Sequence, residues 1–372
     1  MLVPHDEILC HQMATTFDHV GQSDLRWVER IVMYGFDISG DVNVMTGMAR
    51  YPNRNVTDAY AMVTRKDGTA HVARMSTELQ PESAGALGVY QIGPFTYEIE
   101  EPLRAVRVRL APNESGISLD LSLRGRFDAY EQTPAFHRSR GRVLEDARRF
   151  YQNGVVEGFL SIGDERIEID SRKWWFGRDH SWGVRHGGGG GSISEGPERQ
   201  PTEIPDGVLY YMGIFEFDDQ LVHFAQREDS AGRRTQFEGE LLYPSDTQRA
   251  PGRLIDVEHD LTFRDDLRVV SGGSFSIIRD DRSRSQIEVK PLTDFWPGIA
   301  GYDDYRGYAS GYWRGTDFID SFTVNTLEID EIRPASMLSE TLCEVRMDGK
   351  VGHGLVEMVF LGAYPRYGYT GW

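Results

Sequence analysis

The chain contains 372 residues, of which 40% are hydrophobic and 26% are charged, and its formal net charge is −18. This composition excludes a mainly disordered chain, and the acidic balance excludes a nucleic-acid partner, because phosphate binding needs a basic face. No apolar run reaches the roughly 18 residues of a membrane-spanning helix, and the first residues lack the basic and apolar parts of a secretory leader. We therefore expect a cytoplasmic protein without a membrane span.

The first half of the chain shows mostly two-residue periodicity, which is typical of antiparallel strands with one buried face. This pattern predicts two hairpins, Tyr60–Thr64 with Ala70–Met75 and Ala105–Leu110 with Ile117–Leu123. Helical signal is sparse. Two short helices are expected, over Asp24–Met33 and over Arg142–Gln152.

The densest group of reactive side chains follows, between Trp174 and His186, and includes the segment Arg178-Asp179-His180-Ser181-Trp182. In an extended strand, Arg178, His180 and Trp182 share one face, while Asp179 and Ser181 share the other. A bulge would bring both sets to one side. An acid beside an imidazole can serve acid/base chemistry near neutral pH, but the same residues can also form a structural network at a domain joint. The residue types alone favour neither reading.

A segment rich in glycine and proline follows this cluster and runs to Asp206, starting with the five glycines Gly187–Gly191. Its composition predicts either an interdomain linker or a loop that closes over a site. No Lys-Ser/Thr pair and no helix-forming segment follow the glycines, so a phosphate-binding loop is not expected.

The second half again shows strand periodicity, and it predicts three hairpins. They are Leu221–Arg227 with Thr235–Tyr243, Ser274–Ile278 with Gln286–Lys290, and Leu342–Met347 with Gly354–Leu361. Strands in series with short turns over this length indicate an all-β protein with two consecutive antiparallel barrels. The expected domains are a first barrel over residues 1–190, a linker or mobile loop over 191–206, and a second barrel over 207–372.

A second aromatic and acidic stretch, residues 294–306, is too rich in glycine and proline for a strand. It is either the wall of an apolar ligand site or a loop packed on itself. Its candidate ligand-contacting residues are Trp296, Tyr302, Asp303 and Tyr305. The two cysteines, Cys10 and Cys343, are far apart in the chain and form no metal-ligand spacing, so neither a disulfide framework nor a metal site is expected.

Three segments together resemble a known family. They are Phe150–Gly154, Gly158–Gly163 and Gly177-Arg178-Asp179-His180-Ser181-Trp182-Gly183, and a Gly-rich strand at Gly352–Glu357 is added in a bacterial branch. The family is the lipocalin-like superfamily of carotenoid 1,2-hydratases and AttH-type proteins, to which kievitone hydratase and fungal lipocalin-like Diels–Alderases are related. The resemblance implies two calycin-type barrels and a cavity for a hydrophobic terpenoid, polyketide or aromatic substrate. It places Asp179 and His180 at the hydratase motif positions, with Trp182 as a cavity wall.

The function expected from these observations is acid/base chemistry without a cofactor on a hydrophobic small molecule: hydration or dehydration, isomerisation or cyclisation. Asp179 and His180 are the expected catalytic residues, and the expected substrate-binding residues are Arg178, Trp182, Trp175, Tyr302, Asp303, Tyr305 and Trp296. The alternatives are a lipocalin-like carrier without turnover, or a partner-binding module. A homodimer is one oligomeric state compatible with the sequence.

Overall fold

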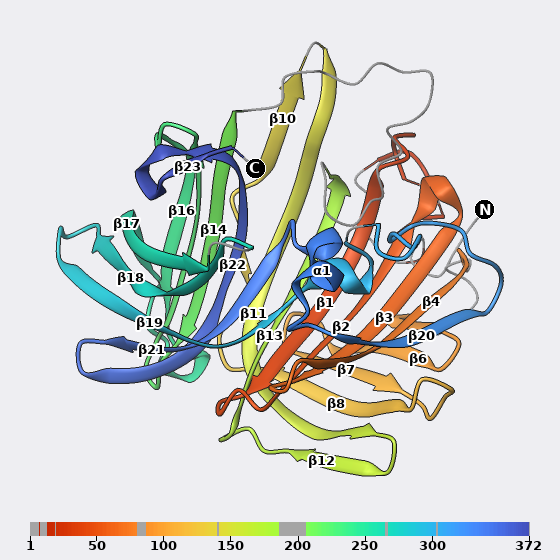
Figure 1. The fold of residues 1–372 in the computed structure, drawn as a ribbon. Coiled ribbons are helices and arrows are strands. Elements are labelled where there is room, and N and C mark those ends of the chain that lie inside the picture. Colours follow the sequence, from red (N-terminus) through yellow and green to blue (C-terminus); the bar gives the residue numbers. More distant parts are fainter. Residues whose placement is uncertain are drawn as a thin grey trace.

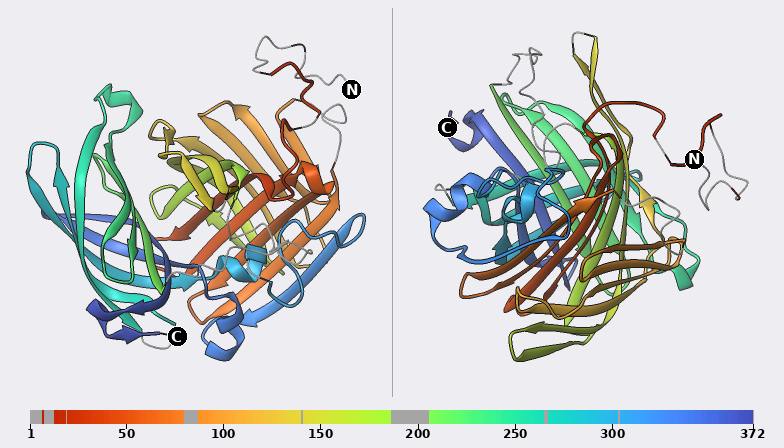
Figure 2. Two further views of the ribbon diagram at one scale, coloured as in Figure 1. Left: turned by 90° about the horizontal axis from the view of Figure 1, so that it is seen from above. Right: turned by 90° about the vertical axis from the view of Figure 1, so that its right-hand side faces the viewer.

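A computed structural model describes residues 7, 13–18, 20–79, 87–139, 141–185, 206–264, 267–302 and 304–371. The chain forms two antiparallel β-sheets that lie beside each other, as Figures 1 and 2 show. Within the described ranges, no helix is long and apolar enough to cross a membrane. The expectation of an all-β, antiparallel protein is confirmed.

The first sheet has 14 strands, and its main path runs β20-β4-β3-β2-β1-β13-β11-β8-β7-β6-β5. The short strands β9, β10 and β12 pair with β11 outside this path. The strands are β1 Trp27–Asp37, β2 Val42–Tyr51, β3 Val56–Arg65, β4 Thr69–Glu78, β5 Val89–Ile92, β6 Phe95–Glu101, β7 Ala105–Leu110, β8 Ile117–Gly125, β9 Tyr130–Glu131, β10 Ala135–Ser139, β11 Arg142–Ile162, β12 Glu165–Ile169, β13 Trp174–Val184 and β20 Phe318–Asn325. The sheet curls strongly, but its end strands, β20 and β5, do not pair with each other.

The second sheet has nine strands in the order β14-β15-β16-β17-β18-β19-β21-β22-β23, and β14 also pairs with β22. The extra pairing closes the sheet into a barrel, which removes the exposed edges of an open sheet. The strands are β14 Gly207–Glu216, β15 Leu221–Asp229, β16 Arg234–Leu242, β17 Gly252–Arg264, β18 Val269–Arg279, β19 Arg284–Phe295, β21 Ser339–Met347, β22 Lys350–Tyr364 and β23 Tyr369–Thr370.

Helical turns in the described chain are short and lie between strands. They are η2 Pro52–Arg54, η4 Ser245–Thr247, η5 Gly298–Tyr302, α1 Ile329–Ile332, η6 Arg333–Ala335 and η7 Pro365–Tyr367. All five predicted hairpins are present, as the pairs β3–β4, β7–β8, β15–β16, β18–β19 and β21–β22. Each follows from alternating apolar residues that end at a turn.

Both predicted helices are wrong. Residues 24–33 lead into and form part of β1, and residues 142–152 form the first half of β11. The second segment pairs with β13 on one side and with β9 and β10 on the other. Backbone pairing with neighbours on both sides overrides the weak local preference for helix.

The buried side chains form three large groups. One fills the inside of the first sheet and another the inside of the closed barrel. The third contains residues from both sheets and from the segment after β19, and it joins the two sheets face to face. We call this third group the inter-sheet layer.

Strand β20 crosses from the second half of the chain back to the first sheet, where it pairs with β4 over eight residues. Figure 1 shows this strand in blue beside the orange β4. The first sheet is therefore completed by residues that follow most of the barrel strands. The domain limits at 190 and 207 stay a prediction, and the glycine-rich segment from Gly187 lies outside the described residues.

Candidate functional site

Strand β13 carries the Arg178–Trp182 motif and lies in the first sheet between β1 and β11. Its pairing with both neighbours proceeds without a register shift, so its side chains alternate strictly. Trp175 belongs to the inter-sheet layer, whereas Trp174 and Phe176 belong to the inside of the first sheet. Asp179 therefore faces the inter-sheet layer, and Arg178, His180 and Trp182 face the other way.

On that other face, the guanidinium of Arg178 is buried and donates to Gln152 Oε1 from Nε at 3.0 Å and from Nη2 at 2.7 Å. A third bond runs from its Nη1 to the Tyr97 hydroxyl at 3.3 Å. Gln152 in turn donates to the backbone carbonyls of Leu103 and Phe127. Arg178 thus ties strands of the first sheet to the loops beside them.

His180 lies further along this face. Its Nε2 is 3.0 Å from Glu29 Oε1, and the centroid of its ring lies 5.2 Å from that of Phe150 and 5.5 Å from that of Trp182. The sheet separates His180 from the Asp179 carboxylate. The catalytic role expected for His180 stays a prediction, but the structure does not bring the two side chains together as a pair.

In the inter-sheet layer, Asp179 forms an ion pair with Arg149 of β11, with Arg149 Nε 3.3 Å from Asp179 Oδ2. The exposed fractions of the two side chains are only 10% and 19%. Arg149 also donates to the Tyr151 hydroxyl at 2.8 Å. Tyr151 is the direct neighbour of Asp179 across the strand pair, so β11 supplies both groups that flank the carboxylate.

The closed barrel places two more carboxyl groups in this layer. Glu340 of β21 and Glu357 of β22 are direct cross-strand partners, and each lies two residues from a leucine of the inter-sheet layer, Leu342 and Leu355. Burial is the main cause that raises the pKa of both carboxyls, to well above the usual range for Glu340. The negative charge of Asp179 acts in the same direction on both carboxyls, and that of Glu357 also raises the pKa of Glu340, while Arg149 opposes these effects on both and Arg185 opposes them on Glu357. Two adjacent carboxyls in such surroundings do not both ionise easily, so the pair favours a shared proton.

Aromatic side chains surround these acids. The ring centroid of Trp175 lies 5.8 Å from that of Tyr34, and Tyr130 lies 5.9 Å from Tyr151 and 4.7 Å from the imidazole of His223. Burial raises the pKa of the three tyrosine hydroxyls well above their usual value, so they stay protonated. The layer therefore presents neutral hydroxyls and aromatic faces to the carboxyl groups.

Several buried polar atoms in this layer have no hydrogen-bond partner among the described residues. They are Asp179 Oδ1, Glu340 Oε2, Trp175 Nε1, Tyr60 Oη, Tyr130 Oη and His223 Nε2. Nearly all buried polar atoms in native proteins are hydrogen-bonded, so a concentration of exceptions needs an explanation. A bound polar molecule would satisfy such atoms, and this is the candidate functional site.

The second aromatic stretch contributes one residue to this site. Tyr302 lies 6.3 Å from Tyr60 between ring centroids, and the guanidinium of Arg30 stacks on it at 4.6 Å. Trp296 and Tyr305 are buried in the same layer, but Tyr305 packs on Phe322 of β20. The substrate-binding roles of Trp296 and Tyr305 stay predictions, and Asp303 lies outside the described residues.

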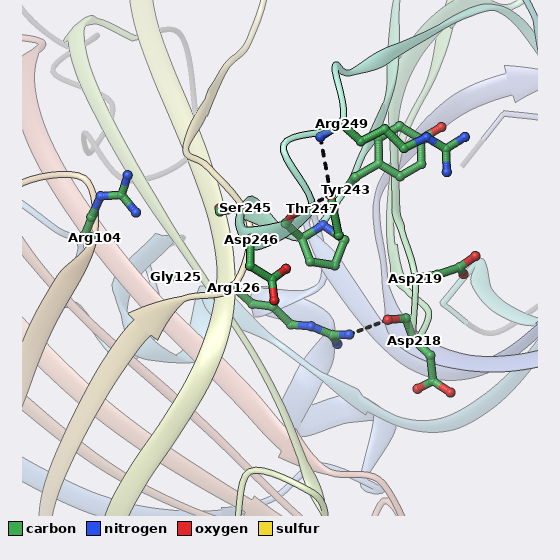
Figure 3. A pocket seen from close by; sticks show the side chains of 11 residues that line it. Arg104, Gly125, Arg126, Asp218, Asp219, Tyr243, Ser245, Asp246, Thr247 and Arg249 are labelled. Atoms are coloured by element: carbon green, nitrogen blue, oxygen red, sulfur yellow. Dashed lines mark hydrogen bonds between the residues drawn. The ribbon is translucent and has the colours of Figure 1, made fainter.

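A separate surface pocket of about 750 Å³ opens where η4 approaches the end of β8. Figure 3 shows Arg126 in this pocket reaching the backbone of Asp218, and Arg249 lying against the ring of Tyr243. Some of its charged side chains already pair within the protein, since Arg126 also forms an ion pair of 2.7 Å with Glu216. Most of its lining side chains are charged or polar, and it does not include the acids of the inter-sheet layer.

Sequence reasoning missed most of the residues that complete the site: Arg149, Tyr151, Tyr34, Tyr130, His223, Glu340 and Glu357. Arg149 and Tyr151 were not identified because their segment was predicted to be a helix, and a helix would not place both side chains on the face of a strand beside Asp179. A usable signal was present at Glu340, which shares its strand face with Leu342. A carboxylate on an apolar face is a candidate for a functional group.

Comparisons with known proteins agree with this architecture. The model of a family of unknown function, DUF8625, matches residues 2–370. An AttH-like protein of Nitrosomonas europaea is similar over 94% of this chain and 97% of its own, with 11% identity and a TM-score of 0.51. CghA, solved with Sch210972, covers 90% and 89% of the two chains at 13% identity and a TM-score of 0.50.

Kievitone hydratase from Nectria haematococca covers 90% of this chain and 89% of its own, at 12% identity and a TM-score of 0.47. A search of curated proteins gives no match. The similarity to the AttH-like protein and to CghA confirms the lipocalin-like fold predicted from the sequence.

Proposed function

The chain belongs to this family of unknown function, DUF8625, and we propose that it is an acid/base enzyme that acts on a hydrophobic small molecule without a cofactor. The observation that carries the proposal is the Glu340–Glu357 carboxyl pair, buried against the Asp179–Arg149 ion pair in an aromatic layer. Enzymes place titratable groups in such surroundings in order to set their pKa values apart.

The Glu340–Glu357 pair is the proton donor in this proposal. Its shared proton transfers to one carbon of an alkene or enol of the substrate, which forms a C–H bond and leaves a carboxylate on the pair. The adjacent substrate carbon becomes electron-deficient. The faces of Trp175 and Tyr34 carry negative electrostatic potential and stabilise this positive charge.

Asp179 is the proton acceptor. In a hydration, the oxygen of water bonds to the electron-deficient carbon, and the proton that water loses passes to the Asp179 carboxylate, which forms an ion pair with Arg149. In an isomerisation or cyclisation, Asp179 takes a proton from carbon instead, and the electron pair of that C–H bond forms the new double bond. Proton return from Asp179 to the glutamate pair, through solvent, restores the starting state.

A carrier without turnover is the competing function. Carriers of apolar ligands line their cavities mainly with apolar side chains. The unpartnered polar atoms in the inter-sheet layer, Asp179 Oδ1 and Glu340 Oε2 among them, favour chemistry over simple carriage.

The test begins with native mass spectrometry and solvent extraction of the purified protein, which identify a co-purifying terpenoid, polyketide or aromatic compound. Turnover of that compound is then compared between wild type, Asp179→Asn and Glu340→Gln. Loss of a positioned general acid or base lowers the rate by roughly 10²- to 10⁴-fold, and we expect the turnover rate of both variants to decrease by a factor in this range. Glu258→Gln is the matched control, because Glu258 lies on β17 with 56% of its side chain exposed.

Folded Asp179→Asn and Glu340→Gln proteins with full turnover would refute the proposal. A stoichiometric ligand that wild type never alters would instead identify a carrier. The same assay on His180→Ala tests the role expected from the sequence motif. Full turnover in that variant would show that His180, on the other face of β13, does not take part.

A further inference from the structure

Three arginines converge on Ser181 in the inter-sheet layer. Arg30 of β1 and Arg149 of β11 are the direct cross-strand neighbours of Ser181, one on each side of β13. Arg185, just beyond the end of β13, turns back and donates from Nη1 to Ser181 Oγ at 2.8 Å. Like charges gathered in one place repel each other, so such a group needs negative charge nearby.

Two of these arginines have a carboxylate within the protein. Arg149 forms its ion pair with Asp179. Arg30 stabilises the charged form of Asp58, which lies in the same row of the sheet two strands away, against the effect of burial. Burial still raises the pKa of Asp58 to about 6.

Arg185 differs from its two neighbours. Its side chain donates to the neutral hydroxyl of Ser181 and forms no ion pair within 4.0 Å in the part of the chain that the structure describes. Burial and the charges of Arg149 and Arg30 together lower its pKa to about 10, although Tyr302 and Asp179 act in the opposite direction. An arginine in such a place is costly to the fold unless its charge is used.

The site is therefore polarised along β13. The three guanidiniums and Tyr302 gather around Ser181, while Asp179 lies one row further and Trp175 two rows beyond that. At about 3.3 Å per residue, the row of Ser181 lies roughly 20 Å from the row of Trp175. Glu340 and Glu357 both act on the pKa of Tyr34, whose row lies between those of Asp179 and Trp175. Arg149 and Arg185 both lower the pKa of Glu357, so the cationic end lies within electrostatic reach of the glutamate pair.

We propose that the substrate of this site is a hydrophobic acid, whose carboxylate, or an equally acidic enolate, is bound by Arg185 together with Arg149. The inference rests on the proposed function and adds the class of substrate to it. The guanidinium fork matches two oxygens of a planar anion, and in a buried site this contact is strong and directional. The apolar body of the molecule extends along Asp179 toward Trp175, which places its reacting carbon near Glu340 and Glu357.

The test measures binding rather than turnover. Retinoic acid, 1-pyrenebutyric acid and cinnamic acid are each compared with their methyl esters by isothermal titration calorimetry on the full-length protein. We expect at least one acid to bind wild type ten-fold or more tightly than its ester. Arg185→Gln should abolish that preference while the ester binds within about two-fold of its wild-type affinity, and Arg185→Lys should retain part of it.

Arg249→Gln is the matched control, because Arg249 lies on the surface pocket against Tyr243 and should leave the preference unchanged. The inference is overturned if no acid is preferred over its ester by wild type, or if folded Arg185→Gln keeps the preference. The two proposals can fail separately. If wild type prefers the acid but Asp179→Asn keeps full turnover, only the proposed catalytic function is refuted. If Asp179→Asn loses turnover but wild type shows no preference for any acid, only the proposed acidic substrate is refuted.

Discussion

The buried imidazole of His223 offers a direct test of the electrostatics in the inter-sheet layer. Its side chain packs on Tyr130 and Tyr151, its Nε2 has no partner among the described residues, and only 2% of the residue is exposed. Burial lowers the pKa of His223 to about 3, and the nearby charge of Arg149 acts in the same direction. His223 is therefore neutral in the folded protein at any pH near neutrality.

The unfolded chain binds a proton at His223 near its ordinary pKa of 6.5, so acid favours unfolding. The stabilising contribution is complete above pH 6.5 and is lost as the pH falls from 6.5 toward 3. Linkage gives a loss of roughly 2.7 kcal/mol at pH 4.5 and about 4.8 kcal/mol once the pH is below both values. This loss is large compared with the free energy of unfolding of a typical protein, which is about 5–15 kcal/mol.

His223→Phe keeps an aromatic ring in this position and removes the titration. Urea unfolding followed by tryptophan fluorescence at pH 7.5 and pH 4.5 gives the free energy of unfolding for wild type, for His223→Phe and for the exposed control His137→Phe. Between the two pH values, wild type should lose about 2.7 kcal/mol more than His223→Phe, while the control follows wild type. Parallel losses in wild type and His223→Phe would show that the imidazole is not held neutral, and would refute the reasoning.

Three further predictions concern the framework around the site. Burial raises the pKa of Glu216 to about 7 despite its ion pair with Arg126, so its stabilising effect is present below pH 4.5 and lost as the pH rises to 7. Glu216→Gln should remove about 3 kcal/mol of this pH dependence in urea titrations. Arg178→Lys removes the two hydrogen bonds to Gln152, so the free energy of unfolding should fall by about 1–3 kcal/mol in the same assay while turnover is retained. A loss of turnover without a loss of stability would instead support the substrate-binding role predicted for Arg178. Gly183 has a φ of 122°, and a Cβ at this position would meet a backbone carbonyl of β11. Gly183→Ala should therefore lower the free energy of unfolding by at least about 1–3 kcal/mol. An unchanged free energy of unfolding would show that this backbone conformation does not require glycine.

Much of the strand pattern could be read from the sequence because alternation is a local property. Ala105–Leu110 and Ile117–Leu123 place apolar residues on one face, and the structure pairs these segments as β7 and β8. The segment 142–152 failed for the opposite reason. Its charged residues suit a helix as well as a strand, and only the pairing of β11 with β13 decides between them.

The candidate site was predictable only in part. The sequence singled out Asp179 and His180 without choosing between them, and the structure places Asp179 in the inter-sheet layer with Trp175; the catalytic role expected for Asp179 stays a prediction. Its partners Glu340 and Glu357 come from strands near the other end of the chain. No local pattern links them to Asp179.

The sequence by itself predicted that Asp179 and His180 point to opposite faces if their strand is regular, since successive side chains of a strand alternate, and it left open a bulge that would bring them together. Its series of amphipathic strands predicted an all-β antiparallel protein, and the resemblance of its motif to a known family implied the lipocalin-like fold. Only the tertiary structure decided which face of β13 meets the closed barrel, and which acids and arginines gather there. The physical reason is that burial of apolar surface acts between segments far apart in the chain, so the partner of each face depends on how the whole molecule packs.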